Sequence, residues 1–328
     1  MASLMRILRR YLVDMLFRAV VFDSALEPIP GKEEVLYNSL YRFLRDIRKC
    51  GVILIDENEE IQKRFLLALK KWNDLSELTD EDYDGQDLLR LLKVLEKENR
   101  LIGTSFEEKE LNCTSESCSL YLNIVQSKKT EFIVTNQVCY SCAKDNLSHL
   151  FETHIIQMAK YDHDYDLQRR VDLRGLRINE YGWDDQLTFE KNVLIPIFRD
   201  TENVTLYDKQ AGDYFNENYK ATVKWFLKVY LDYSKSPKSG TFELHIGKLK
   251  TGSKGQERKQ LLCEFEREMQ NIYPAFKVVH KSHFSHDRFV GTDQVEIDIG
   301  RGFDLLDNIK DAYPCRLKET KIGYVDKR

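Results

Sequence analysis

Two short apolar runs, each ending on an aspartate, decide the fold of the first half of the chain. Residues 18–26 read RAVVFDSAL and contain Asp23, and residues 52–65 read VILIDENEEIQKRF and contain Asp56. Between them, residues 33–50 place apolar side chains at helical spacing. Apolar strands that alternate with helices through short connections predict a parallel sheet with helices packed on its faces.

Polar residues follow three of the predicted strands. Asp23 and Asp56 end the first two, and Asn136 follows a third apolar run over residues 131–135. Functional groups in parallel sheets collect at the carboxyl ends of the strands, so we expect these side chains to mark a site. Further helices are expected at residues 61–72 and 86–99.

The second half repeats an α/β pattern after a charged connection at residues 160–183. We expect strands at residues 204–207, 242–246, 276–280, 288–290 and 295–299, and helices at residues 219–233 and 256–273. The 328 residues of the chain also favour two domains. We place them at residues 1–165 and 170–328.

Composition excludes several classes of protein. Hydrophobic residues make up 42% and aromatic residues 11% of the chain, enough for packed cores and against wholesale disorder. Residues 1–170 hold 24 Lys and Arg against 29 Asp and Glu, so any contact with a polyanion must come from a local patch. Charged residues interrupt the apolar opening segment, and the remaining apolar runs are strand-sized. We therefore expect no signal peptide, no transmembrane helix and a cytoplasmic protein.

Four of the seven cysteines are clustered in the sequence. Cys113 and Cys118 form a C-x4-C pair, and Cys139 and Cys142 form a C-x2-C pair after a gap of twenty residues. Two close thiolate pairs are what a tetrahedral zinc site uses. Neither pair has the glycine or aromatic residues of a zinc knuckle, so buried packing cysteines are the alternative interpretation.

The stretch SHFSHDRFVGTDQVEIDIGRGFDLLDN, residues 282–308, carries a family resemblance. With the runs at residues 204–208, 225–228 and 314–320, it resembles the phospholipase-D-like C-terminal domain of MIT-domain-containing proteins. The resemblance spans residues 180–328 and implies a phospholipase-D-like α/β domain that binds lipid without catalysis. The MIT domain has no counterpart here, and related prokaryotic domains are suspected of roles in defence.

His286, Arg288 and Asp293 follow the spacing H-x-R-x4-D. This spacing is similar to the phospholipase D signature, with Arg in place of Lys. The resemblance implies a phosphorus-attacking histidine, a phosphate-holding cation and a supporting aspartate. Such enzymes need two motifs and the chain has one, so a homodimer would have to supply the second. The alternative is that Arg288 binds phosphate without catalysis.

The first half is similar to PIN-like nucleases in its runs VVFD, VILIDENEEIQKRF and TEFIVTNQ. The resemblance implies carboxylates at the strand ends that hold Mg²⁺ or Mn²⁺ and activate water. The candidate acids are Asp23, Glu34 (or Glu33), Asp56 and Glu116. The chain departs from the family pattern at Asn136, where an aspartate is expected, and on the preceding helix, which carries the cysteine pair where another aspartate is expected.

We therefore expect an α/β protein with an N-terminal parallel-sheet PIN-like domain and a C-terminal phospholipase-D-like domain. The leading hypothesis is a metal-dependent nuclease effector of a prokaryotic defence or toxin system, which acts on nucleic acid and responds to a partner protein. One alternative is a non-catalytic adaptor that binds phosphate, lipid or a partner, and another is a phospholipase-D-type nuclease that uses His286. Convergence of Asp23 and Asp56 would favour the enzyme, whereas separated or ion-paired carboxylates would favour the adaptor.

Overall fold

The chain forms two compact units. The computed structural model describes residues 15–78, 84–109, 111, 113, 116–128, 130–147, 153–164, 168, 186–247, 249, 252–281, 288–300, 302–303, 305–306 and 322–324. One unit comprises Leu16–Asp172, and the other comprises Leu173–Arg328 together with Met1–Met15. The expected connection at residues 160–183 lies mostly outside the described residues. No helix within the described ranges is long and apolar enough to cross a membrane.

The first unit is built on a five-stranded sheet with the strand order β3-β2-β1-β4-β5. Every neighbouring pair is parallel, which confirms the parallel sheet expected for this half of the chain. The strands are β1 (Phe17–Val21), β2 (Gly51–Asp56), β3 (Leu101–Thr104), β4 (Phe132–Thr135) and β5 (His154–Gln157). The sequence analysis did not predict the edge strands β3 and β5.

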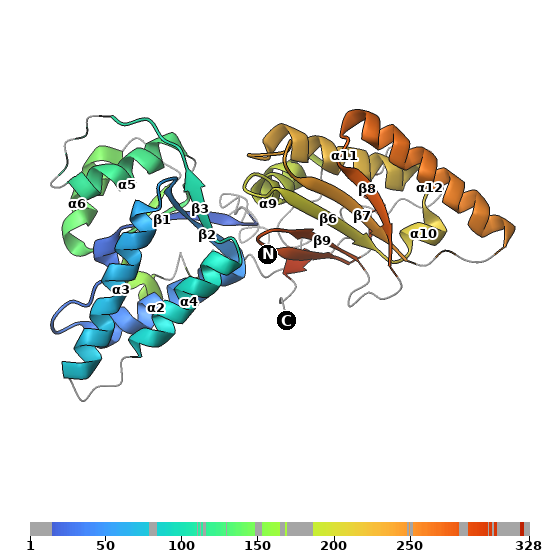
Figure 1. The fold of residues 1–328 in the computed structure, drawn as a ribbon. Helices are drawn as coiled ribbons and strands as arrows, with labels where there is room; N and C mark the ends of the chain where they lie inside the picture. Colours follow the sequence, from blue (N-terminus) through green and yellow to red (C-terminus); the bar gives the residue numbers. More distant parts are fainter. Residues whose placement is uncertain are drawn as a thin grey trace, which may run out of the picture. The chain divides into compact units, whose positions relative to one another are not determined.

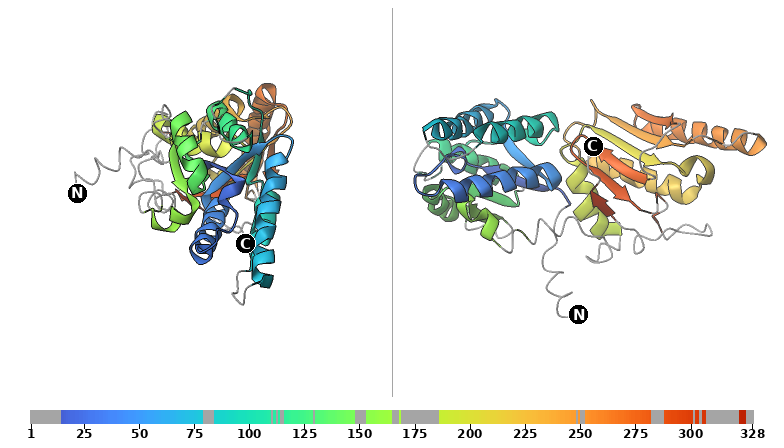
Figure 2. Two further views of the ribbon diagram at one scale, coloured as in Figure 1. Left: turned by 90° about the vertical axis from the view of Figure 1, so that its left-hand side faces the viewer. Right: turned by 90° about the horizontal axis from the view of Figure 1, so that it is seen from below.

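Helices cover both faces of this sheet (Figures 1 and 2), with α5 and α6 on one face and α2, α3 and α4 on the other. These helices are α2 (Glu33–Cys50), α3 (Glu60–Leu78), α4 (Gly85–Lys97), α5 (Glu116–Ser127) and α6 (Gln137–Leu147). Two 3₁₀ segments, η1 (Asp23–Ala25) and η2 (Met158–His163), follow β1 and β5. The helices α2, α3 and α4 form where the periodicity predicts them: α2 buries Leu36, Leu40, Phe43, Leu44 and Ile47 along one face.

The second unit contains a six-stranded mixed sheet with the strand order β11-β10-β9-β6-β7-β8. β6, β7 and β8 are parallel, whereas β9 runs antiparallel to β6 and is followed by two further antiparallel pairings. The strands are β6 (Asn203–Asp208), β7 (Thr241–Ile246), β8 (Phe276–His280), β9 (Arg288–Thr292), β10 (Glu296–Ile299) and β11 (Ile322–Tyr324). The mixed α/β class of the chain is thus confirmed.

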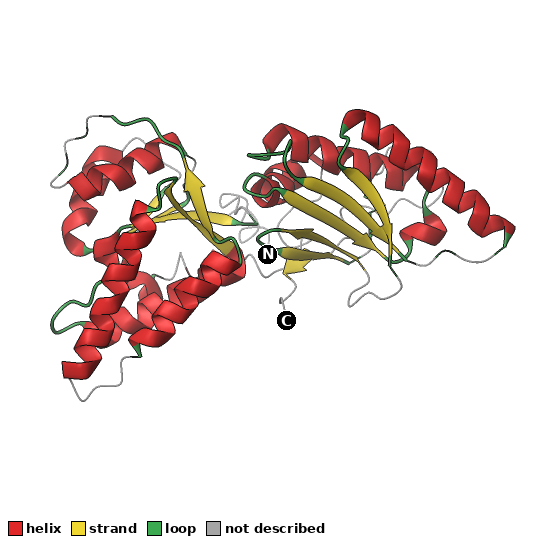
Figure 3. Ribbon diagram, viewed as in Figure 1, coloured by secondary structure: helices red, strands yellow, loops and turns green. Residues whose placement is uncertain are grey.

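Helices and strands alternate along the second unit as well (Figure 3). The helices are α8 (Gln186–Phe189), α9 (Ile195–Phe198), α10 (Ala211–Tyr214), α11 (Glu217–Tyr233) and α12 (Ser253–Ile272). A π-helical segment, η4 (Glu190–Leu194), joins α8 and α9. α11 is the central packing element, because it buries Trp225, Phe226 and Tyr230 together with six further side chains.

Candidate functional site

The carboxyl ends of β1 and β4 lie at the topological switch point of the first sheet, where the order in which strands are added reverses. From β1 the chain builds β2 and β3 on one side, and then places β4 and β5 on the other. Open α/β sheets bind ligands in the crevice at such a switch point. β1 leads into Asp23, and β4 leads into Asn136. These two residues therefore mark the most favourable place for a site.

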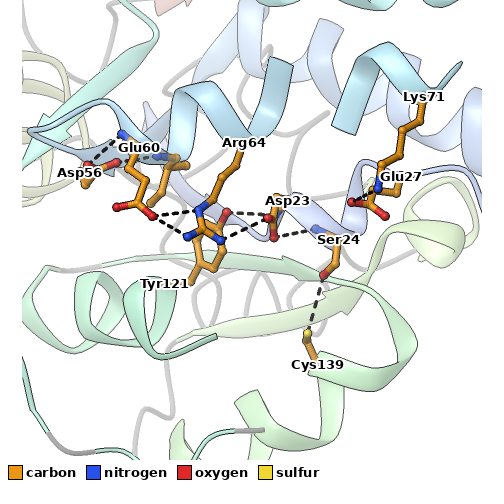
Figure 4. Close-up of polar contacts among 10 residues, drawn as sticks. Asp23, Ser24, Glu27, Asp56, Glu60, Arg64, Lys71, Tyr121 and Cys139 are labelled. Carbon is orange, nitrogen blue, oxygen red and sulfur yellow. Dashed lines mark hydrogen bonds and ion pairs between the residues drawn. The ribbon is translucent and has the colours of Figure 1, made fainter. Parts of the chain in front are cut away.

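Asp23 is held in a defined position at the start of η1 (Figure 4). Its backbone N–H donates to the hydroxyl of Tyr121 on α5 at 3.2 Å, and its Oδ1 accepts the N–H of Ser24 at 2.8 Å. Its Oδ2 lies 3.8 Å from Nη1 of Arg64, and the side chain is 22% exposed. The carboxylate is thus oriented by the protein and still accessible to solvent.

Tyr121 supports Asp23 as a neutral hydroxyl. Burial, with a smaller contribution from the charge of Asp23, raises the pKa of Tyr121. The phenol therefore keeps its proton at neutral pH. It can accept the N–H of Asp23 without placing a second negative charge beside the carboxylate.

Arg64 lies between two carboxylates at this edge. Its Nη2 is 2.5 Å from Oε1 of Glu60, and its Nε donates to the same oxygen at 3.1 Å. Glu60 precedes Arg64 by four residues on α3, the spacing at which helical side chains meet. The hydrogen bond to Glu60 is the main reason that the pKa of Arg64 is raised. Asp23 and Glu60 thus share the guanidinium of Arg64. The sequence analysis missed this feature, although Glu60 and Arg64 both lie in the quoted run of residues 52–65.

Asp56 acts as a cap for the helix that follows it. Its Oδ2 accepts the backbone N–H of Glu60 at 3.0 Å, and its Oδ1 accepts that of Ile61 at 2.7 Å. The residue is only 4% exposed. Both oxygens therefore serve the unpaired donors of the first turn of α3, where a negative charge also complements the helix dipole. Asp56 is explained by local structure without a metal ion.

A further predicted acid, Glu34, is not brought to Asp23. Glu34 is exposed in the first turn of α2, and the described residues give no contact between it and Asp23. Glu116 begins α5, but its side chain lies outside the described part of the structure. Asn136 accepts the N–H of Cys139 at 2.8 Å and so caps α6. Within the described residues, no group of three acids lies close enough to hold one ion.

The edge nevertheless carries an excess of negative charge. Asp23, Asp56 and Glu60 contribute three carboxylates, and Arg64 contributes the one positive charge among these four residues. Nearby, Glu27 and Lys71 form a separate ion pair of 2.8 Å that adds no net charge. Such an edge attracts a divalent cation and repels a phosphate that arrives without one.

Three of the four cysteines that are clustered in the sequence meet beside this edge. Cys113, Cys118 and Cys142 have sulfur atoms that all lie within 4.8 Å of one another, and the Sγ atoms of Cys118 and Cys142 are 3.4 Å apart. Cys139 is hydrogen-bonded with Cys118 and lies 3.6 Å from the hydroxyl of Ser24. The fold thus brings together three of the four residues that the spacing singled out, and Cys139 lies outside this group of three.

The thiols differ in how easily they ionise. A hydrogen bond from Cys118, with a smaller contribution from Ser24, lowers the pKa of Cys139 to about 6 against the opposing effect of burial. The hydrogen bond to Cys139, followed by burial, raises the pKa of Cys118. Burial is the main reason that the pKa of Cys113 is raised. In the absence of an ion, Cys139 is therefore the thiol that ionises first.

In the second unit, Arg288 is partly exposed and contacts several neighbouring groups. Its Nε lies 3.8 Å from Oδ1 of Asp208, a fully buried carboxylate on β6, and its other nitrogens donate to the side chain of Gln210 and the carbonyl oxygen of Gly300. Gly302 has φ +103°, and a Cβ there would come within 2.7 Å of Asp208. The motif around Gly302 therefore packs on the Asp208–Arg288 pair.

Asp293 does not share a site with Arg288. Arg288 begins β9, whereas Asp293 follows the end of that strand, about 17 Å away in an extended chain. Its Oδ2 accepts the hydroxyl of Thr201 at 2.8 Å and the N–H of Glu202 at 2.6 Å. Asp293 thus fixes the loop before β6. His286 lies outside the described residues, so its prediction stays untested.

Comparisons with family models and with curated proteins give no match for this chain. The resemblances to PIN-like nucleases and to the phospholipase-D-like domain therefore remain hypotheses, and the function is argued from the two units themselves.

Proposed function

We propose that the first unit is a nuclease that depends on Mg²⁺ or Mn²⁺ and acts at the carboxyl edge of its sheet. The observation that carries this proposal is the position of Asp23: a partly exposed carboxylate at the switch point, beside Glu60 and Arg64. Carboxylates in excess over cations suit a hard divalent ion and a substrate that is itself anionic.

Asp23 and Glu60 are the residues that would hold the ion. Mg²⁺ is commonly bound through one or two carboxylates, with water and substrate phosphate completing its shell, so two acids suffice. When bound, the ion supplies an activated water and stabilises charge on the phosphodiester. Asp56 leaves the set of ligands that the sequence predicted, because both of its oxygens cap α3.

Arg64 is the residue that would contact the substrate phosphate. A guanidinium matches the geometry of a phosphate and can bind two of its oxygens at once. Glu60 is 55% exposed, so its carboxylate is free to turn from Arg64 toward the ion when a phosphate takes its place. Tyr121 keeps Asp23 in place during this exchange, because its hydroxyl oxygen accepts the backbone N–H of Asp23.

The ion pair between Asp23 and Arg64 favours the second candidate function, a non-catalytic adaptor. The free energy of this ion pair decides how strongly it argues against metal binding at Asp23. The two groups are 3.8 Å apart and are 22% and 33% exposed, and exposed pairs contribute about 0–1 kcal/mol. A divalent cation can displace so weak a contact. The adaptor therefore remains the alternative, and the nuclease remains the proposal.

The second unit is proposed as the part that senses a signal or binds a partner, in the context of a defence or toxin system. Arg288 supports the structure through Asp208, so a phosphate contact would have to use the face of its guanidinium that remains open. A nuclease site that uses His286 is the further alternative, and it would need no metal.

The test is incubation of the full-length chain with labelled single- and double-stranded RNA and DNA, in Mg²⁺, Mn²⁺ or EDTA. We expect cleavage with the metal ions, none in EDTA, and none by Asp23→Asn. Asp74→Asn is a matched control, because Asp74 is exposed on α3. Binding without cleavage in every metal would support the adaptor. Cleavage that persists in EDTA would move the active site to the second unit.

A further inference from the structure

The four cysteines come from three separate segments of the first unit. Cys113 precedes α5, Cys118 lies in the first turn of α5, and Cys139 and Cys142 lie one turn apart on α6. Cys118 and Cys142 are buried, whereas Cys113 and Cys139 are partly exposed. A small ion could therefore enter from the side of Cys113 and Cys139 and be enclosed by the other two.

The spacing of three of the sulfur atoms, those of Cys113, Cys118 and Cys142, fits a tetrahedral zinc ion, and Cys139 is the neighbouring thiol that would complete the set. Zn–S bonds of about 2.3 Å place the sulfur atoms of a tetrahedron about 3.8 Å apart. The distance of 3.4 Å between Cys118 and Cys142, and the limit of 4.8 Å that holds for three of the thiols, bracket this value.

The cluster also touches the residues that hold Asp23. Tyr121, which accepts the N–H of Asp23, stands one turn after Cys118 on α5. Ser24, which follows Asp23, lies 3.6 Å from the sulfur atom of Cys139 on α6. Both helices that would be joined by the ion therefore contact the loop that carries the candidate catalytic carboxylate.

We propose that Cys113, Cys118, Cys139 and Cys142 bind one Zn²⁺, and that this ion fixes α5 and α6 against the loop at Asp23. The zinc site stands on the cysteine geometry alone, whereas the control of Asp23 rests on the nuclease function proposed above. The ion is structural, because four protein thiolates leave no open coordination position for a substrate.

The zinc site is tested by metal analysis of the full-length chain purified without chelators. We expect about one zinc per chain, and thiolate-to-metal charge-transfer absorption when Co²⁺ replaces it. Cys118→Ser and Cys142→Ser should lose the metal, while Cys263→Ser should keep it, because Cys263 is exposed on α12 in the other unit. A metal-free chain, or a disulfide between Cys118 and Cys142 in mass analysis under non-reducing conditions, would overturn the zinc site.

The control of Asp23 is tested by hydrogen exchange before and after zinc is removed with a chelator. We expect faster exchange in residues 22–26, α5 and α6, and unchanged exchange in α11 of the other unit. If zinc is bound but its removal leaves residues 22–26 unchanged, the coupling is wrong and the zinc site stands. If the chain cleaves no nucleic acid but loses zinc with the expected exchange, only the nuclease function fails.

Discussion

Replacing Asp56 by alanine separates a helix cap from a metal ligand. The change removes two acceptors for backbone donors, at 3.0 Å and 2.7 Å, from the first turn of α3, and it removes a buried negative charge from the positive end of the helix dipole. Loss of a cap costs roughly 0.5–2 kcal/mol, and loss of a favourable, partly buried charge costs up to about 2 kcal/mol. Together we expect about 2–3 kcal/mol.

This cost can be measured locally by hydrogen exchange, because α3 opens before or together with its unit. A loss of about 2–3 kcal/mol corresponds to exchange in the first turns of α3 that is roughly 30- to 150-fold faster. Asp56→Asn keeps one acceptor and should show a smaller effect. Asp74→Ala, an exposed change on the same helix, should alter exchange by less than about threefold.

The reasoning fails if Asp56→Ala leaves the exchange of α3 at the level of Asp74→Ala. It also fails if Asp56→Ala abolishes cleavage while the exchange of α3 is unchanged. That second result would restore Asp56 to the metal site for which the sequence proposed it. Asp23→Asn gives the opposite pattern in our account: a loss of cleavage with a cost of no more than about 1 kcal/mol, since only an exposed ion pair is removed.

Three further predictions concern the second unit. Arg288→Ala should lower the thermal stability of this unit by more than the replacement of an exposed arginine does, because Asp208 is left buried without its cation. In a double-mutant cycle, adding Asp208→Asn to Arg288→Ala should recover part of this loss. Burial lowers the pKa of His245 from its ordinary value of 6.5 despite the hydrogen bond to Glu243, so the folded state binds fewer protons than the unfolded state. The free energy of unfolding should therefore fall as the pH drops below 6.5, and His245→Gln should flatten that decline in denaturant titrations at several pH values. Asp293→Ala should increase proteolysis of the loop before β6 without changing metal-dependent cleavage, since its carboxylate holds that loop.

The sequence predicted the architecture well where local periodicity decides the structure. Alternation of apolar strands and amphipathic helices placed β1, α2, β2 and β4 within a few residues of their observed bounds. The strands β3 and β5 were missed, because four-residue strands at the edges of a sheet are too short and too mixed to show a pattern. The interior order of the second sheet was equally inaccessible, since periodicity does not reveal which strand pairs with which.

The candidate site was predicted only in part. Asp23 could be singled out because it ends a buried strand, and the cysteine pairs because their spacing is characteristic. The roles of Tyr121 and Arg64 depend on contacts between α5, α3 and η1, which arise only when the chain folds. The sequence also cannot distinguish an aspartate that caps a helix from one that binds a metal. Asp56 ends a strand and precedes a helix, and this position suits either role.

The most direct test of the central claim is a cleavage assay that compares the unmodified chain with Asp23→Asn and Asp74→Asn on labelled nucleic acid. The account predicts cleavage in Mg²⁺ or Mn²⁺ by the unmodified chain and by Asp74→Asn, and none by Asp23→Asn or in EDTA. Cleavage by Asp23→Asn at the rate of the unmodified chain would contradict it, because no other described acid takes the place of Asp23 at the switch point.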